Sequence, residues 1–422
     1  VPPDENEDPY FAAADKKHDP YAALRIADYR RLVLACVASS IGGEIQAVAI
    51  GWELYERTRS ATVLGLIGLV QLLPVYLLAL PSGHAADRYS RTRLFVIAEA
   101  LLALAAAGMA VLSFGGGPVW AFYACLALTG TGQALLRPAR WALMPQVVPR
   151  DLLQNAVTWN STSWQTAAIA GPAIGGTIIA LAGGAAWAYV LTAVLSGLAI
   201  VQIGSIRAKP APNPTEPTTL GTFLAGFKFI WSNDLILATI TLDLFAVLLG
   251  GAQALLPMFA SDILHVGPAG LGWLRSAESI GALMMALTLA HRRPFQKAGP
   301  TLVVAVTAFG LAMVGFGLSR DVRLSFLMLL IAGAVDNISV VVRSTLIQTL
   351  TPDSMRGRVS AVNSLFIGTS NELGGFESGL TAAFFGPIAS VVGGGIGTLV
   401  VVAVVVVAWP RLLSLGPLHK PS

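Results

Sequence analysis

Long apolar runs recur along the whole chain and constrain its fold more than any other feature. A helix needs about 20 mostly apolar residues to cross a bilayer. Twelve such stretches cover residues 31–54, 61–80, 94–114, 118–140, 153–182, 185–204, 235–256, 268–290, 301–319, 323–344, 359–384 and 387–409. None alternates as a barrel strand does, so we expect an all-α membrane protein with twelve transmembrane helices.

The charge content agrees with this interpretation. Charged residues make up 12% of the 422 residues, against about 25% in soluble domains, which is too few to coat two or three soluble domains. A cytosolic enzyme and a disordered chain are therefore excluded. The two cysteines, Cys36 and Cys125, lie inside apolar runs, so we expect no disulfide framework, no metal site and no cofactor.

Polar segments separate the runs into a predicted domain order. The first 22 residues are polar and lack a signal-peptide core, and the missing initiator Met suggests that a start has been removed. A Pro-rich link at 206–219 precedes a predicted amphipathic surface helix at 220–231. The expected order is a disordered cytoplasmic tail, a six-helix bundle, a cytoplasmic linker, a second six-helix bundle and a cytoplasmic tail, covering residues 1–22, 23–205, 206–232, 233–411 and 412–422.

The basic residues fall mainly on one side of the predicted membrane. Of the 27 Lys and Arg residues, 22 lie in the terminal tails and alternate loops. The opposite loops hold Arg57, Arg59, Arg320 and Arg323, and Arg275 lies within a span. This asymmetry is the positive-inside pattern, with both termini cytoplasmic. The sequence pI of 9.2 therefore reports topology, and no nucleic-acid partner is expected.

The two halves of the chain resemble each other at an offset of 203 residues. Nine of 44 positions are identical between 137–180 and 340–383, including Arg140/Arg343, Pro149/Pro352 and Asn160/Asn363. Duplicated six-helix halves with a substrate site at their interface are a known transporter architecture.

A loop between the second and third runs carries a recognisable motif. Gly83-His-Ala-Ala-Asp87-Arg88-Tyr-Ser90-Arg91-Thr-Arg93 resembles the G-x-x-x-D-R-x-G-R signature of the major facilitator superfamily, with Ser90 in place of the second Gly. The resemblance implies two pseudo-symmetric six-helix bundles. It also implies that Gly83, Asp87, Arg88 and Arg91 form a conformational latch, although plain positive-inside charge also explains the arginines.

Two further segments extend the resemblance. Gly171-Pro172-Ala-Ile-Gly175-Gly176 resembles the GPxxGG signature of the superfamily's antiporters, and small-residue packing explains it equally well. Segments 137–176 and 352–379 resemble the enterobactin-exporter branch, which implies export of siderophores or drug-like molecules driven by protons. The Arg that many proton antiporters carry in span four is missing from Trp120–Leu128, which weakens the implied proton mechanism.

Ionisable residues inside the spans are functional candidates because charge is costly at that depth. The proton or cation candidates are Glu44, Asp243, Asp336, Glu372 and Glu377, and Arg275 with Glu278 is the candidate anion contact. Arg275 and Glu278 share a helix face and either neutralise each other or contact substrate. Asp336 either pairs with Arg343 or joins the site. The side chains expected to line a cavity are Gln46, Trp159, Trp164, Gln165, Asn337 and Asn371.

These features predict a monomeric secondary transporter in a bacterial inner membrane. We expect a proton-coupled exporter that works by alternating access on a small-molecule substrate, with protons and the lipid bilayer as its other partners. A lipid or lysophospholipid flippase on the same fold is the alternative. An intramembrane enzyme is disfavoured, because all five histidines lie at loops or span ends and no HExxH motif occurs.

Overall fold

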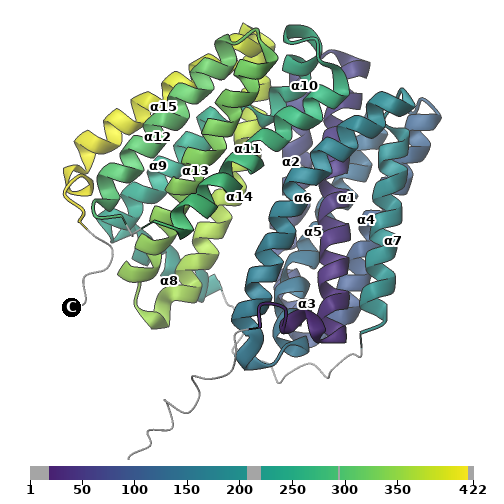
Figure 1. Ribbon diagram of the computed structural model, residues 1–422, viewed down its shortest axis with the longest axis horizontal. Helices are drawn as coiled ribbons and strands as arrows, with labels where there is room; N and C mark the ends of the chain where they lie inside the picture. The colour runs from purple at the N-terminus through teal and green to yellow at the C-terminus, as the bar shows by residue number, and fades with distance from the viewer. Residues whose placement is uncertain (1–18, 207–219, 293–294, 417–422) are drawn as a thin grey trace, which may run out of the picture.

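The computed structural model describes residues 19–206, 220–292 and 295–416, and within these ranges the chain is helical with no strand. This confirms the predicted all-α class (Figure 1). The predicted tails at 1–18 and 417–422 and the link at 207–219 lie outside the described residues. The last residues of the predicted N-terminal tail lie on α6 (Leu153–Ala182), where the Pro20 carbonyl accepts hydrogen bonds from Asn155 and Trp159.

The first half of the chain forms the N-terminal bundle. Besides α6, its helices are α1 (Ala27–Thr58), α2 (Ala61–Leu77), α3 (Ala79–Arg88), α4 (Arg91–Phe114), α5 (Val119–Val147) and α7 (Ala186–Gly204). Helix α1 packs against α6 and α7, and α4 packs against α5 and α7. The apolar run 61–80 is interrupted at Leu78, which separates α2 from α3. Pro81 explains the interruption, because it has no backbone N–H to donate to the Leu77 carbonyl four residues earlier.

The second half forms the C-terminal bundle. Its helices are α8 (Leu220–Trp231), α9 (Asp234–Gly250), α10 (Leu256–Met258), α11 (Gly267–Ala290), α12 (Ala298–Leu318), α13 (Val322–Leu350), α14 (Asp353–Phe385) and α15 (Pro387–Ala408). Side chains of Asn233 and Asp321 cap α9 and α13 by accepting backbone N–H groups. Helix α8 covers the predicted amphipathic segment and packs on α14 and α9.

Among the described residues, nine helices are long and apolar enough to cross a membrane. Helix α2 is shorter, and α11 and α14 carry the ionisable residues that lower their hydropathy. Each of these three helices packs against another long helix of the bundles: α11 packs against α6, and α2 packs against α14. The count of twelve transmembrane helices therefore stays a prediction.

Several basic residues that were counted with the loops lie inside helices, among them Arg140 and Arg343. Helices α5 and α13 continue past the predicted ends at 140 and 344 to Val147 and Leu350. Arg140 is therefore part of α5, and Arg343 is buried in α13 with 3% of its surface exposed. These two cations take part in packing within the bundles, so they carry less topological information than the sequence pattern suggested.

The two bundles converge near α10 and diverge toward α3 and α8 (Figure 1). Two seams join them along their sides, one between α2 and α14 and the other between α6 and α11. Glycines make both seams tight: a Cβ added at Gly65 would lie 3.1 Å from the Gly379 Cα, and one added at Gly272 would lie 3.2 Å from the Gly176 Cα. Only a hydrogen side chain allows backbones to approach this closely.

We predict that Gly272→Ala destabilises the protein. Its Cβ would overlap the Pro172 carbonyl oxygen, and overpacking of this kind costs about 1–3 kcal/mol. Thermal unfolding of the detergent-solubilised chain should show a lower Tm. The matched control is Gly197→Ala on α7, where an added Cβ meets nothing within 4 Å and improved helix propensity should keep or raise the Tm. Equal melting of the two variants would contradict the proposed seam.

Candidate functional site

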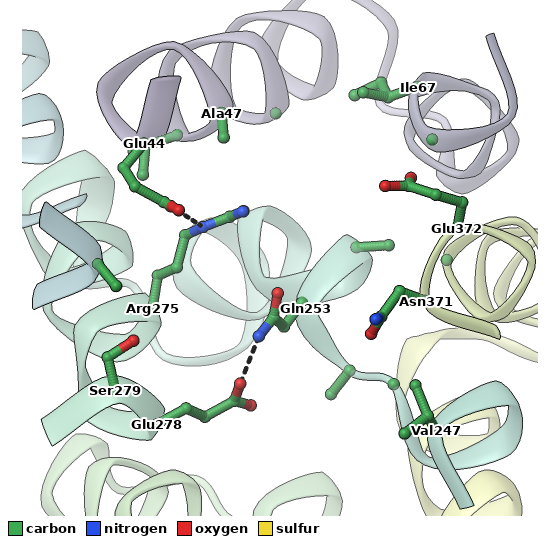
Figure 2. A pocket seen from close by; sticks show the side chains of 18 of the residues that line it. Glu44, Ala47, Ile67, Val247, Gln253, Arg275, Glu278, Ser279, Asn371 and Glu372 are labelled. Atoms are coloured by element: carbon green, nitrogen blue, oxygen red, sulfur yellow. Dashed lines mark hydrogen bonds and ion pairs between the residues drawn. The ribbon is translucent and has the colours of Figure 1, made fainter. Parts of the chain in front are cut away.

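A central cavity of about 580 Å³ lies between the bundles. Its wall is built from α1, α2 and α6 of the N-terminal bundle and from α9, α11, α12, α13, α14 and the segment at 251–257 of the C-terminal bundle. The polar side chains that line it are Glu44, Gln71, Gln165, Gln253, Arg275, Glu278, Ser279, Asp336, Asn371 and Glu372. Figure 2 shows several of them pointing toward one another from separate helices.

An ion pair between Glu44 and Arg275 crosses this cavity from one bundle to the other. The Arg275 Nε lies 3.8 Å from the Glu44 Oε2, and the two side chains are 25% and 23% exposed. A charge-assisted hydrogen bond would be about 2.7–2.9 Å long, so this pair is held by electrostatic attraction without a tight bond. A proton or a charged substrate group can therefore separate it at modest cost.

Close packing of α6 positions the Glu44 side chain. Gly171 lies against it, and a Cβ added at Gly171 would come within 2.5 Å of the Glu44 Cβ. Gly175 similarly lies against the backbone of Ile45. Within the GPxxGG segment, Gly171 and Gly175 pack α6 against α1, and Gly176 packs it against α11. The segment therefore connects the helix that carries Glu44 to the helix that carries Arg275.

Glu278 and Asp336 lie on the C-terminal side of the cavity. The Gln253 amide donates a hydrogen bond to the Glu278 carboxylate, and Asp336 lines the same cavity from α13. Arg275 forms its ion pair with Glu44 on the opposite bundle. Arg275 and Glu278, which share a face of α11, therefore have different primary partners.

Glu372 and Asn371 reach the cavity from α14. Glu372 lies against Gly68 of α2, where an added side chain would overlap its carboxylate. The Asn371 amide donates to the Ile367 carbonyl one turn earlier. Glu377, five residues further along α14, lies outside the residues that line the cavity.

Asp243 has a structural partner within its own bundle. It forms a buried ion pair with Arg343, which ties α9 to α13. The suggested pairing of Asp336 with Arg343 is therefore wrong, because Asp243 occupies the position next to the guanidinium.

The predicted cavity residues divide into two groups. Trp164, Gln165 and Asn371 line the cavity. The others lie outside its lining: Gln46 donates a buried hydrogen bond to Thr129, Trp159 contacts Tyr21, and the Asn337 side-chain oxygen is buried without a hydrogen-bond partner in the structure.

The predicted latch lies at the end of the N-terminal bundle that carries α3. Gly83, Asp87 and Arg88 belong to α3, and Arg91 begins α4. The Arg91 guanidinium donates to the Ala142 carbonyl at 2.8 Å. This contact fixes the start of α4 to the far part of α5.

Comparison with known proteins identifies the family. Residues 18–414 match the transmembrane secretion effector family of the major facilitator superfamily. The chain belongs to this family. It is 26% identical over 393 residues to the enterobactin exporter EntS of Citrobacter koseri, covering 93% of this chain and 92% of that protein. It is also 27% identical over 379 residues to the enterobactin exporter EntS of Shigella boydii, covering 88% and 89%.

Solved structures support the same fold. A bacterial homologue of the human lysosomal transporter Spinster, in an inward-facing and occupied conformation, superposes with a TM-score of 0.74 at 13% identity, covering 96% of this chain and 100% of that chain. The nucleoside transporter NupG gives a TM-score of 0.73 at 13% identity, covering 90% and 99%. Membership of this family points to membrane transport rather than catalysis, and the fold agrees with it.

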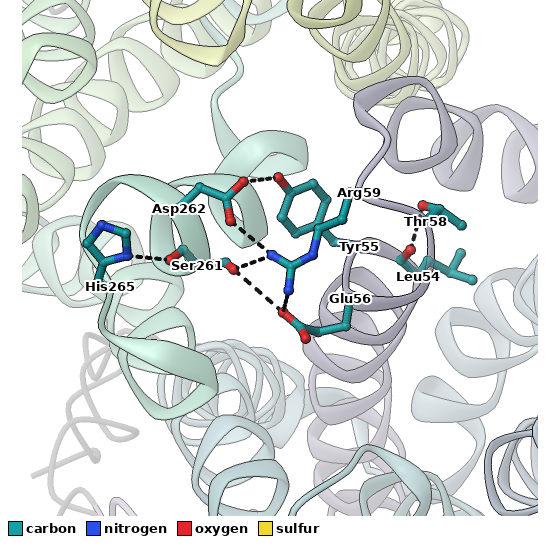
Figure 3. A network of polar contacts seen from close by, with 8 residues as sticks. All are labelled: Leu54, Tyr55, Glu56, Thr58, Arg59, Ser261, Asp262 and His265. Atoms are coloured by element: carbon teal, nitrogen blue, oxygen red, sulfur yellow. Dashed lines mark hydrogen bonds and ion pairs between the residues drawn. The ribbon is translucent and has the colours of Figure 1, made fainter.

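A polar network between the bundles of this family member was not foreseen from the sequence. Arg59 follows α1 and bonds to Ser261 and Asp262 of η4 (Phe259–Ile263), a π-helical turn at the α10 end. The Tyr55 hydroxyl also donates to Asp262, and Arg59 pairs with Glu56 (Figure 3). The sequence showed Arg59 only as a loop cation, because its partners lie about 200 residues away.

Glu99 was also missed, although its signal was visible in the sequence. It is a carboxyl residue inside the apolar run 94–114, and the structure buries it completely, with 0% of its surface exposed. Gln71 and Gln253 were also missed, although they lie inside predicted apolar runs as Gln46 and Gln165 do.

We predict that Asp262→Asn loosens closure at the α10 end. The change removes the ion pair with Arg59 and weakens the hydrogen bond from Tyr55. Partly exposed contacts of this kind contribute about 1 kcal/mol each. Hydrogen–deuterium exchange of residues 256–264 should accelerate by up to about tenfold. The matched control is Asp321→Asn, which removes the same charge but keeps a good helix cap; equal exchange in both variants would contradict the role of the network.

Proposed function

We propose that this protein is a proton-coupled exporter of a siderophore or drug-like small molecule that works by alternating access. The observation that carries the proposal is the Glu44–Arg275 pair, which joins the two bundles inside the central cavity. A charge pair that spans two rigid bodies makes their relative position depend on the charge of either partner. That dependence is what coupling a proton to transport requires.

Protonation of Glu44 is the proposed coupling step. While Glu44 is ionised, it attracts Arg275 and favours the arrangement seen here. A proton on Glu44 removes the attraction and leaves the Arg275 guanidinium available to an anionic or carbonyl oxygen of the substrate. Glu278, Asp336 and Glu372 line the other walls and are the proposed additional proton or cation acceptors.

Cavity size and chemistry support a drug-sized substrate. Ligand pockets for such molecules have volumes of about 300–1,000 Å³, and the cavity of about 580 Å³ lies within this range. Trp164 offers an aromatic surface, while Gln165, Gln253 and Asn371 offer hydrogen bonds. The similarity to proteins named enterobactin exporters favours a siderophore.

The arrangement of the bundles supports an inward-open loading state. The bundles meet near η4 and diverge toward α3 and α8 (Figure 1), which is the end where Arg88, Arg91 and Lys228 lie. By the positive-inside rule this end faces the cytoplasm of a bacterial inner membrane, together with both termini. Gly83, Asp87, Arg88 and Arg91 are the proposed cytoplasmic latch that holds the bundles when they close there.

The tight seams favour an exporter over a lipid flippase. A flippase needs a sideways opening between the bundles for a lipid headgroup. The glycine contacts of α2 with α14 and of α6 with α11 leave such a route narrow in this state.

We predict that Glu44→Gln uncouples transport from the proton gradient. The amide keeps the shape of the carboxyl but cannot ionise, so a pH gradient should no longer drive substrate accumulation in proteoliposomes. We expect a loss of at least about tenfold, equivalent to about 1.4 kcal/mol. Substrate exchange without a gradient should be less affected.

The matched control is Asp151→Asn, which removes an exposed carboxylate between α5 and α6 and should transport as wild type does. Wild-type coupling in Glu44→Gln would remove this residue from the mechanism. Movement of a headgroup-labelled lipid by the wild type without any pH dependence would favour the flippase.

A further inference from the structure

A buried polar cluster inside the N-terminal bundle lies apart from the central cavity. Its centre is Glu99 on α4, which has no exposed surface. Neither of its carboxylate oxygens makes a hydrogen bond of ordinary geometry, although the hydroxyls of Ser39 on α1 and Ser196 on α7 lie beside it. Glu99 is not among the residues that line the cavity.

Arg140 on α5 is the cation whose charge acts on Glu99, and it is only partly bonded. Its guanidinium donates to the Asn160 side-chain oxygen at 2.8 Å and reaches the Ser40 hydroxyl at 3.5 Å. Its Nε atom is buried without a hydrogen-bond partner in the structure. The Glu99 carboxyl, which has only serine hydroxyls beside it, and the unpartnered Arg140 Nε therefore interact electrostatically without forming an ion pair in the structure.

The internal repeat shows what is unusual about this cluster. At the offset of 203 residues, Arg140 corresponds to Arg343, and Ser40 corresponds to Asp243. In the C-terminal bundle the arginine forms a direct ion pair with Asp243. In the N-terminal bundle Ser40 occupies the position that corresponds to Asp243, and the carboxyl group comes from Glu99 on α4.

We propose that Glu99 is a second proton-binding carboxyl, which acts through Arg140 and not through the substrate cavity. A proton on Glu99 leaves Arg140 bonded to Asn160, as in the structure. An ionised Glu99 attracts Arg140 away from Asn160 and releases the tie between α5 and α6.

Helix α6 transmits this change to the transport site. Asn160 is on the same helix as Trp164 and Gln165, which line the cavity. One turn further, the Ile169 carbonyl accepts a hydrogen bond from Ser276 of α11, next to Arg275. The proton on Glu99 thereby regulates the contact between the bundles, and in this respect the inference rests on the proposed transport function.

The groups that face Glu99 limit what else can titrate there. Cys36 of α1 is the titratable neighbour of Glu99, Arg140 of α5 is the charged one, and Ser39 of α1 and Ser196 of α7 are uncharged. Tyr29 of α1 interacts with Cys36 and Arg140. Arg91, two turns earlier on α4, is bonded to the Ala142 carbonyl. A carboxyl signal from this cluster therefore belongs to Glu99 alone.

Infrared difference spectroscopy of the full-length protein across mildly acidic to mildly alkaline pH tests the assignment without any substrate. A protonated carboxyl gives a carbonyl stretch that disappears on ionisation. We expect Glu99→Gln to lose one titrating band of the wild type. Glu53→Gln, which removes another buried carboxyl that is already paired with Arg57 at 2.6 Å, should keep that band.

A pH profile of substrate transport tests the regulatory role. The pH profile of the wild-type transport rate should show a step that is absent in Glu99→Gln. Glu99→Asp should restore this step at a shifted pH. An unchanged set of infrared bands and an unchanged pH profile in Glu99→Gln would overturn the inference.

Two outcomes separate this inference from the proposed function. If the wild type shows no proton-driven transport, the proposed function fails while the infrared band still reports on Glu99. If Glu99→Gln does not fold, Glu99→Asp decides instead: an unshifted band midpoint in that variant would overturn the assignment.

Discussion

Burying a charged side chain in an apolar interior costs several kcal/mol unless an opposite charge or hydrogen bonds compensate it, and this cost organises the whole protein. The chain places two kinds of ion pair at depth. Asp243 and Arg343 lie within one bundle and are almost fully buried, so they stabilise that bundle as a unit. Glu44 and Arg275 lie on different bundles and are partly exposed in the cavity, so they connect the two bundles.

Small residues determine where those units touch. Glycines on α2, α6, α11 and α14 bring backbones of opposite bundles into contact along two seams, while Gly171 seats α6 directly against Glu44. The packing motif and the charged pair are therefore parts of one arrangement. A displacement of α6 relative to α1 or α11 therefore changes the surroundings of Glu44, which lines the cavity.

The sequence predicted the fold well and the site in part. Helix positions follow from apolar runs of membrane length, and Glu44, Arg275, Glu278, Asp336 and Glu372 were visible because charge is rare within such runs. The ion pairs were harder to predict, because Arg343 pairs with Asp243 on a neighbouring helix and not with Asp336 on its own helix. Contacts such as Arg59 with Asp262 depend on how two bundles dock, and no local pattern encodes that docking.

We propose that the bundles rock around the Glu44–Arg275 pair, so that one end opens as the other closes. Spin-label distances in a variant without Cys36 and Cys125 test it most directly, with one pair of labels at Asp151 and Asp353 and another at Ala182 and Arg320. These are exposed positions at the α3 and α10 ends of the two bundles. Adding substrate or changing pH should shorten one distance and lengthen the other. Distances that stay fixed, or that change together in the same direction, would contradict alternating access.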